Sequence, residues 1–310
     1  MTEAVLSESG EVATPAKARA LSADEFQRIF VARNHGVVSA EDQERIGAAK
    51  VLVAGCGSIG GSAVEPLVRL GFRRLVLADP GSYELTNLNR QNATVDDLGR
   101  NKAAVAAERA RAINPHVEVE VVEEGVAEHT VDRLLDGVQV VIDGVDVTMP
   151  SGLRAKGLLH ERVRERRLPL MTGWDMSATQ YVRVYDYRTD RPIFDGAVTR
   201  RQLDEMPMWG LLARLIPATK VPRDLIALIR RGLGEKDFTF PQLVQAADLF
   251  GLIAATLTAR LVTGRPVPSS AGVDVHALTM PLSHRLRDRL RQPLEVAALL
   301  AAVQRNRFRR

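Results

Sequence analysis

"VLVAGCGSIGG" (residues 51–61) is an apolar run that ends in a glycine-rich loop and continues as a helix. The loop contains the pattern Gly55-x-Gly57-x-x-Gly60. Glycines permit a tight turn and close approach of the backbone to a ligand. The first N–H groups of the helix that follows carry a partial positive charge, which attracts phosphate. This strand, loop and helix together predict a nucleotide-binding α/β fold.

Apolar, strand-like runs alternate with helical segments on the C-terminal side of this loop. We expect strands at 50–54, 73–78, 117–122, 138–142 and 168–172, and helices near 59–70, 100–113, 129–135 and 151–166. This alternation predicts a doubly wound, mainly parallel, Rossmann-like sheet with helices on both faces. Residues 178–187, "ATQYVRVYDY", alternate between apolar and polar and predict an antiparallel extension.

The segments before and after this core do not follow the alternation of strands and helices. Ser22 begins a helix, with Glu25 as its capping-box partner. Helices broken by Gly and Pro follow the antiparallel strand, with one further strand expected at 271–280. We therefore divide the chain into a disordered lead-in (1–20), an N-terminal helical arm (21–49), an ATP-binding α/β domain (50–190) and a C-terminal helical region for substrate or dimer contacts (191–310).

Composition narrows the function classes. The chain has 310 residues, of which 45% are apolar and 26% charged, so it can bury a large core. We find no apolar run long enough to cross a bilayer and no signal-peptide core, and so we expect a cytoplasmic protein without a membrane partner. The single cysteine, Cys56, excludes an internal disulfide and a cysteine-based zinc site.

The formal net charge is +4, and the excess is mostly arginine in residues 161–167, 284–292 and 305–310. A basic excess of this kind is compatible with a polyanion such as RNA. Acidic residues are interspersed in the first two runs, which favours solvated helix faces there. A tRNA partner is therefore possible but not favoured, and the last six residues remain a candidate basic tail.

The segment 75–102, "LVLADPGSYELTNLNRQNATVDDLGRNK", bears on which nucleotide is bound. Asp79 ends the second strand 24 residues after Gly55, where a carboxylate can accept hydrogen bonds from ribose hydroxyls. The segment also holds four of the seven asparagines in the chain. Hydride transfer from a dinucleotide does not need such a polar loop, whereas a triphosphate does.

Four side chains of this segment suit a triphosphate. Asn87 and Asn89 can hold ribose and phosphate oxygens. Arg90 and Lys102 can neutralise the charge that builds up when an α-phosphate is attacked. The alternative is that residues 87–92 only form turns and that Arg90 is a surface charge. The set taken together favours ATP.

Asp146 follows the fourth strand in "VIDGVDVT" and so lies at the carboxyl edge of the sheet. A carboxylate that faces a triphosphate is most simply explained as a ligand of Mg²⁺. Trp174 and Asp175 are expected at the same edge, after the fifth strand. They either line a substrate groove or form a packed Trp beside a turn acid, and the sequence leaves both interpretations open.

The motifs "GCGSIGG…LADPGSYELTNLNRQ…GRNK…NP…VIDGVD" resemble the ThiF/MoeB family of ubiquitin-activating-enzyme-like adenylyltransferases over about residues 25–185. The Asp-x7-Asn-Leu-x-Arg-Gln element is more specific than the glycine loop. The resemblance implies adenylation of a carboxylate, which attacks the α-phosphate of ATP and releases pyrophosphate. It implies a phosphate loop (Gly55, Gly57, Gly60), a ribose ligand (Asp79), phosphate contacts (Asn87, Arg90, Lys102) and a Mg²⁺ ligand (Asp146).

The resemblance also implies a homodimer in which an arginine of the N-terminal helix reaches the ATP of the partner. Arg33 is the nearest match, and Arg28 is the second choice. The N-terminal helix has no obvious slot in a doubly wound monomer, and the long apolar segment "LFGLIAATLTARLV" offers more apolar surface than one sheet needs. Both features favour a two-fold interface.

Several positions depart from the family. Val147 replaces the Asn that usually follows the metal aspartate, and Gly81 replaces a second acid near the ribose ligand. The CxxC zinc motifs and the thioester-forming cysteine are absent, and Cys56 lies inside the glycine loop, which suits a small buried residue. We therefore expect an acyl-adenylate without an enzyme thioester.

The resemblance leaves the substrate open. It is the C-terminus of a small carrier protein or peptide, or a small-molecule acid. One alternative is a tRNA-modifying enzyme similar to threonylcarbamoyladenosine dehydratase. Another is a non-catalytic, nucleotide-binding partner subunit, against which the joint presence of Arg90, Lys102 and Asp146 argues.

Overall fold

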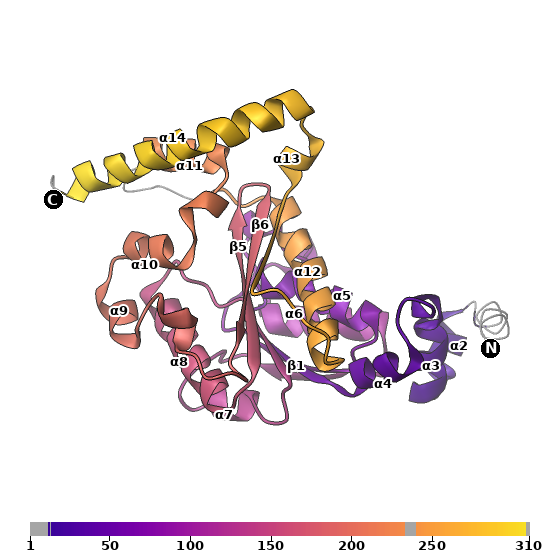
Figure 1. Cartoon of the computed structure of the whole chain (residues 1–310). Coiled ribbons are helices and arrows are strands. Elements are labelled where there is room, and N and C mark those ends of the chain that lie inside the picture. The colour runs from indigo at the N-terminus through magenta and orange to yellow at the C-terminus, as the bar shows by residue number, and fades with distance from the viewer. Residues whose placement is uncertain (1–11, 13, 233–239, 308–310) are drawn as a thin grey trace.

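The computed structural model describes residues 12, 14–232 and 240–307 (Figure 1). In this part of the chain one sheet has the strand order β3-β2-β1-β4-β5-β6-β7. The strands are β1 Lys50–Ala54, β2 Arg74–Ala78, β3 Glu118–Val122, β4 Val140–Asp143, β5 Pro169–Met176, β6 Thr179–Asp186 and β7 Ser270–Asp274. The first five in this order are parallel, and β6 and β7 are antiparallel additions. The predicted fold class is confirmed.

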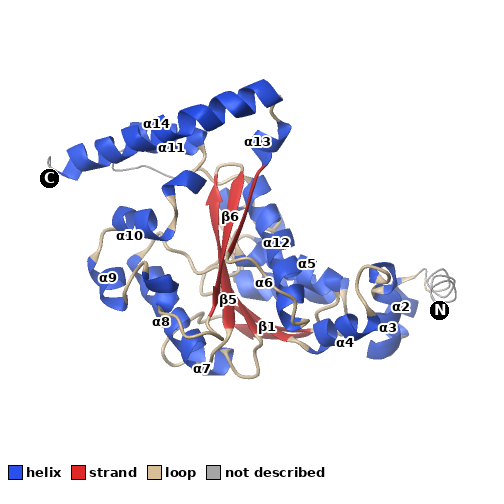
Figure 2. Ribbon diagram, in the orientation of Figure 1, coloured by secondary structure: helices blue, strands red, loops and turns tan. Residues whose placement is uncertain are grey.

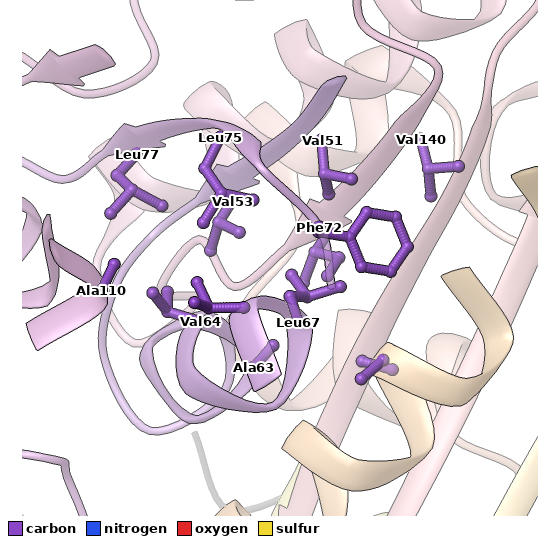
Figure 3. Packing of buried hydrophobic residues seen from close by; sticks show 14 of the residues in the cluster. Val51, Val53, Ala63, Val64, Leu67, Phe72, Leu75, Leu77, Ala110 and Val140 are labelled. Atoms are coloured by element: carbon purple, nitrogen blue, oxygen red, sulfur yellow. The ribbon is translucent and has the colours of Figure 1, made fainter. Parts of the chain in front are cut away.

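Successive side chains along each central strand point alternately to the two faces of the sheet, and both faces are buried. Val51 and Val53 point into one hydrophobic cluster, whereas Leu52 and Ala54 point into the other. The first cluster is closed by α5 (Gly60–Leu70), α6 (Lys102–Ile113) and α12 (Val244–Val262). Figure 3 shows the strand residues of this cluster facing Leu67 and Phe72. Burial on both faces explains why the parallel strands are continuous apolar runs.

The opposite face is covered by α7 (Val131–Leu134) and α8 (Pro150–Glu165), with α9 (Arg200–Glu205), α10 (Met208–Leu215) and α11 (Arg223–Gly232) beyond them. Short 3₁₀ turns, η4 (Ile193–Gly196) and η5 (Ala218–Lys220), join these helices to the rest. The breaks in the predicted helical region fall at Pro207, Pro217 and Pro222. Proline lacks the N–H that would continue a helix, so each one starts a new element.

By length and composition helix α12 could span a membrane, so the expectation that no apolar run is long enough is wrong. Half of its most apolar window is buried inside the fold, and it packs on α5, β5 and β6. A Cβ at Gly251 would lie 2.2 Å from the carbonyl oxygen of Ser62, so the two helices cross at close range. Helix α12 is therefore in part a core helix, whereas Val244 and Leu252 are exposed on it, and a dimer surface there stays a prediction.

The predicted disorder of residues 1–20 is wrong for its second half. Helix α2 (Pro15–Ala20) begins at a proline, and the Thr14 hydroxyl accepts a hydrogen bond from the N–H of Lys17. Proline at the first position and a threonine cap both favour a helix start. The earlier part, residues 1–11 and 13, lies outside the described residues.

The N-terminal arm continues with α3 (Ala23–Phe30), η1 (Ala32–Asn34) and α4 (Ala40–Ala48). The predicted capping box of Ser22 and Glu25 is confirmed. The amide of Gln27 donates to the carbonyl of Gly71 (2.8 Å), and those of Asn34 and Gln43 donate to the carbonyl of Leu70 (3.3 and 3.0 Å).

These carbonyls close the C-terminal end of α5, where a helix leaves its last C=O groups without intrahelical partners. The arm satisfies them with side-chain amides, and Asp24 also pairs with Arg73 at 3.2 Å. The expectation that the arm has no slot in the monomer is therefore wrong. It caps α5 of its own chain.

Strand β7 is shorter than predicted. It ends at Asp274, whose side chain accepts a hydrogen bond from the N–H of Ala277 and caps α13 (Val275–Thr279). Helix α14 (Leu282–Arg307) then runs along α11, away from the sheet (Figure 2). Arg230 and Glu295 join the two helices at 2.7 Å, and Arg223 pairs with Asp288. Because β7 pairs with β6 and α12 covers the sheet, the predicted division at residue 190 separates parts of one sheet.

Candidate functional site

The site lies at the carboxyl ends of β1, β2 and β4. From β1 the chain proceeds to β2 and β3 on one side, and β4 and β5 lie on the other side. Ligands of doubly wound sheets bind at such a reversal of strand order. The glycine loop follows β1, Asp79 follows β2 and Asp146 follows β4. The fold thus brings the sequence-predicted residues to one edge, with the exception of Arg33.

The glycines of the loop serve different purposes. Gly55 has φ +86°, and a Cβ there would lie 2.3 Å from the carbonyl oxygen of Gly144. A Cβ at Gly60 would lie 1.9 Å from the carbonyl oxygen of Gly55, so the loop's own backbone excludes any side chain. At Gly57 the nearest atoms would be those of the Gln91 side chain, 3.8 to 4.0 Å away. The chain itself does not require Gly57, and its bare backbone leaves room for a ligand.

Asp79 ties the loop to the second strand. Its Oδ2 accepts a hydrogen bond from the N–H of Cys56 (2.5 Å), and its Oδ1 accepts one from the N–H of Gly81 (2.6 Å). Burial raises the pKa of the carboxyl group, and the two N–H donors and the charge of Lys102 partly offset that rise. The Asn101 amide donates to the carbonyl of Asp79 (2.8 Å) and so fixes the start of α6 against this strand end.

Lys102 is the first residue of α6, and Asn101 caps that helix by accepting from the N–H of Ala104 (3.1 Å). The Nζ atom of Lys102 lies 5.7 Å from the centroid of the Tyr83 ring. The Lys102 charge opposes the rise in the pKa of Asp79. The ammonium is therefore held at the same edge as the Asp79 carboxylate.

The Asn/Arg loop is folded partly on itself. Asn87 Oδ1 accepts from the N–H of Glu84 (3.1 Å) and caps η2 (Leu85–Asn87), a turn-forming role that the sequence allowed. The Asn89 amide donates to the carbonyl of Gln242 (3.2 Å) and accepts from Arg90 Nη1 (2.8 Å). Arg90 Nη1 also donates to the carbonyl of Thr86 (2.9 Å).

The Arg90 guanidinium has a further N–H group besides those that bond to this loop. Its Nε is buried and has no hydrogen-bond partner among the described residues. Burial lowers the pKa of Arg90, and the charges of Asp175 and Asp146 raise it. An N–H group of this kind is costly to bury without an acceptor, so it points to a bound ligand.

Asp146 is exposed, and its two oxygens accept from the N–H and the hydroxyl of Thr148, both at 2.8 Å. Among the described residues no three His, Cys, Asp or Glu side chains are grouped to hold a metal. Mg²⁺ bound to nucleotide phosphates needs only one or two protein carboxylates. Asp146 fits that mode of binding, and a metal held by protein ligands alone does not fit this site.

Arg33 lies away from this edge. It is exposed in η1, next to Asn34, which contacts the carbonyl of Leu70 at the C-terminal end of α5. The glycine loop precedes the other end of this 11-residue helix, about 16 Å away. Arg33 therefore does not contribute to the site of its own chain.

The structure decides between the two interpretations of Trp174 and Asp175. Trp174 is packed in the core, with Lys156 Nζ 5.8 Å from its ring centroid. Burial raises the pKa of Asp175 to about 6, although the nearby hydroxyl of Ser58 and the charge of Arg90 oppose that shift. Asp175 thus lies within hydrogen-bonding reach of Ser58 in the glycine loop. Its only signal in the sequence was an acid at the carboxyl end of a buried strand.

A buried polar network, which sequence reasoning missed, supports the loop that carries Asp146. Asp143 Oδ2 lies 2.5 Å from Lys156 Nζ and 3.0 Å from His160 Nε2, and Tyr187 Oη lies 2.7 Å from His160 Nδ1. The Tyr187 oxygen accepts from the N–H of Phe194, so its own O–H donates to Nδ1 and the imidazole donates from Nε2 to Asp143. Burial favours a raised pKa at Asp143, but Lys156 and His160 outweigh burial and lower it.

The ThiF family profile matches residues 31–293. Protein MT1398 of Mycobacterium tuberculosis is 30% identical over 280 residues, which cover 86% of this chain and 36% of that protein. The SAMP-activating enzyme E1 of Haloferax volcanii is 36% identical over 137 residues, 44% of this chain and 49% of that enzyme. The chain thus spans about a third to a half of the length of these curated relatives.

Two solved structures have the same fold. PaaA superimposes with a TM-score of 0.58 at 18% identity, covering 83% of this chain and 82% of PaaA. Escherichia coli tRNA N6-threonylcarbamoyladenosine dehydratase, solved in complex with ATP, has a TM-score of 0.54 at 25% identity and covers 78% of this chain and 96% of that one. The profile match, the sheet order and the glycine loop agree, and the chain belongs to the ThiF family of E1-like adenylyltransferases.

Proposed function

We propose that this protein adenylates a carboxylate with ATP and releases pyrophosphate. The observation that carries the proposal is the convergence, at one sheet edge, of the bare Gly57 backbone with the cationic side chains of Arg90 and Lys102. The structure of a ThiF-fold dehydratase with ATP supports the choice of nucleotide.

Each residue of the edge has a proposed task. The N–H groups at the start of α5, with Gly55, Gly57 and Gly60, cradle phosphate. Asp79 accepts hydrogen bonds from the ribose, and the amides of Asn87 and Asn89 contact ribose and phosphate oxygens. Arg90 and Lys102 stabilise the negative charge that develops as the carboxylate attacks the α-phosphate. Mg²⁺, when bound, would be held by Asp146 and would neutralise phosphate charge.

The acyl group is proposed to leave the site without an enzyme thioester. Cys56 is fully buried, and burial raises the pKa of its thiol well above the ordinary value. A thiol that stays protonated inside the glycine loop is a poor nucleophile. The acyl-adenylate is therefore attacked by a group from a partner or from the substrate itself. The substrate is the C-terminus of a carrier protein or peptide, or a small acid.

ATP–pyrophosphate exchange tests the proposal most simply. Purified protein is screened with a panel of carboxylates, ATP and Mg²⁺, and we expect exchange that depends on one class of acid. Direct titration should show binding of ATP rather than NAD. Tight NAD binding without ATP binding would contradict the proposal, and exchange with any acid would exclude a non-catalytic partner subunit.

A second candidate is a tRNA-modifying enzyme. The supporting observation is that tRNA threonylcarbamoyladenosine dehydratase of Escherichia coli is 37% identical over 126 residues, 40% of this chain and 45% of that enzyme. The basic C-terminal residues fit it as well. Salt-sensitive binding of tRNA, with adenylation of a tRNA-borne carboxylate, would favour this candidate.

A further inference from the structure

Asp175 is the penultimate residue of β5 and presents a buried carboxylate to the glycine loop. With the Gln180 amide oriented so that both of its polar atoms are satisfied, Gln180 donates to Asp175 Oδ1 at 2.6 Å and to the carbonyl of Ala246 at 3.0 Å. The hydroxyl of Ser58 in the glycine loop also hydrogen-bonds to this carboxyl group. The second oxygen, Oδ2, is buried and has no hydrogen-bond partner in the part of the chain that the structure describes. A buried charge with an unused acceptor is destabilising unless a ligand completes it.

Arg90 carries the charge opposite to that of Asp175, but the two side chains make no direct hydrogen bond among the described contacts. Each charge shifts the pKa of the other. The hydrogen bonds of the Arg90 guanidinium among the described residues go to Thr86 and Asn89 and not to Asp175. Among the described residues, Arg90 has a buried donor without a partner, Nε, and Asp175 has a buried acceptor without a partner, Oδ2. A group that satisfies both atoms must offer an acceptor to Arg90 and a donor to Asp175.

Nucleotide phosphates do not meet this requirement, because they carry only acceptors and negative charge. A carboxylate that carries an N–H donor on the neighbouring carbon does meet it. Its carboxylate oxygens face Arg90, close to where the α-phosphate is attacked, and its N–H faces Asp175. Charge also favours this assignment, since a buried carboxylate repels phosphate and attracts an N–H donor, above all a cationic one.

We propose that Asp175 is a specificity-determining residue that accepts a hydrogen bond from an N–H on the carbon next to the carboxylate of the acyl substrate. The substrate is then an α-amino or α-acylamino acid. This inference rests on the proposed adenylation. The N–H comes either from the ammonium of a free amino acid or from the last amide of a peptide or carrier-protein C-terminus, and both sources share the same chemistry.

The test compares acids that differ only in this N–H. Free amino acids, their N-acetyl derivatives and the matching acids without nitrogen are assayed by ATP–pyrophosphate exchange. A site with a buried acceptor rejects a ligand that leaves it unpaired, so the nitrogen-free acid should have a kcat/KM about 10- to 100-fold lower. Preference for the free amino acid identifies an ammonium, and preference for the acetylated form identifies an amide.

Asp175→Asn and Asp175→Ala should remove most of this discrimination while ATP affinity, measured by calorimetric titration, stays unchanged. Asp186→Asn is the matched control, because Asp186 ends β6 at the far side of the same hairpin and pairs with Arg188 at 2.8 Å. It should discriminate as the unaltered protein does.

The possible failures are distinct. Absence of exchange with every acid would overturn the proposed adenylation together with the inference. Exchange that is equally efficient with nitrogen-free acids would overturn the role of Asp175 alone, even if the variants fail to fold. Weaker ATP or Mg²⁺ binding in Asp175→Asn, with discrimination retained, would assign the carboxylate to the nucleotide or its metal instead.

Discussion

Gly57 and Gly60 are three residues apart in one loop but differ in what a methyl group would meet. At Gly60 it would press on the carbonyl of Gly55, whereas at Gly57 it would reach only the Gln91 side chain. We predict that Gly57→Ala weakens ATP binding about 10-fold or more and leaves the unfolding temperature nearly unchanged. Gly60→Ala should lower the free energy of unfolding by several kcal/mol, roughly the scale of severe backbone strain.

Thermal unfolding and ATP titration of the two variants check this prediction together. Unchanged ATP affinity in Gly57→Ala would show that the open backbone at this position does not meet a phosphate.

Asp175 should carry a stability cost that depends on pH. Burial raises the pKa of the Asp175 carboxyl to about 6 from its ordinary value of 3.8, so the folded protein binds this proton more tightly than the unfolded chain does. The ionised group therefore destabilises the fold at pH 8, and the penalty fades as the pH falls through about 6 toward 4. Without ligand, Asp175→Asn should raise the free energy of unfolding at pH 8 by up to about 3 kcal/mol, and by less at pH 5.

Calorimetric unfolding at the two pH values measures this effect. A variant that is less stable than the unaltered protein at pH 8 would indicate that Asp175 is a structural anchor rather than a ligand-binding group.

For Cys56 we predict that substitution has little effect on activity. Its thiol is buried and its pKa is raised, so Cys56→Ala should retain most adenylation and acyl transfer. A small loss of stability, about 1 kcal/mol, is expected from the altered packing. Complete loss of acyl transfer with adenylation preserved would show that the thiol is a nucleophile after all.

At the scale of elements, α8 and β4 are held together by the Asp143, Lys156 and His160 network. Lys156→Met removes the cation from a fully buried carboxylate and should lower the free energy of unfolding by about 3–5 kcal/mol. Arg162→Met breaks the exposed pairs with Glu128 and Glu165 on the outer side of the same helix and should cost much less. Denaturant unfolding compares the two, and equal losses would contradict a structural role for the buried pair.

Most elements of the parallel core could be predicted from the sequence to within about two residues. The exception is β5, which ends at Met176 rather than at residue 172, so Trp174 and Asp175 lie within the strand and not after it. The run 50–54 is apolar throughout because both faces of β1 are buried, and the helix after the glycine loop is amphipathic against the sheet. The failures have local causes. Asp274 caps a helix where a continuing strand was expected, and Thr14 with Pro15 starts a helix in a polar segment that lacks periodicity.

At the scale of the whole molecule, the contacts that join distant segments were not predictable. No pattern in the sequence indicates that the amides of the N-terminal arm close the end of α5, or that Asp175 comes to face Ser58 and Arg90. Motif residues such as Asp79 and Lys102 could be placed, because strand ends of a parallel sheet meet at one edge. Side chains that acquire their environment only through tertiary packing could not.

The arm also bears on assembly. Arg33 is exposed at the far end of α5, so any catalytic role requires the site of a second copy. We predict a homodimer in which an equal mixture of Arg33→Ala and Lys102→Ala chains regains about a quarter of full activity, since half of the dimers are mixed and each has one intact site. A mixture without recovery after confirmed subunit exchange, or a stable monomer that still adenylates, would contradict the shared site.

The most direct test of the account is the incorporation of labelled pyrophosphate into ATP by the unaltered protein and by Lys102→Ala and Arg90→Ala, each with the acid that the screen identifies. In this proposal both cations stabilise the negative charge of the transition state. Each variant should therefore lose activity by about 10²-fold or more, while its unfolding temperature stays the same. Incorporation that is unchanged in both correctly folded variants would contradict the assignment of this sheet edge as the adenylation site.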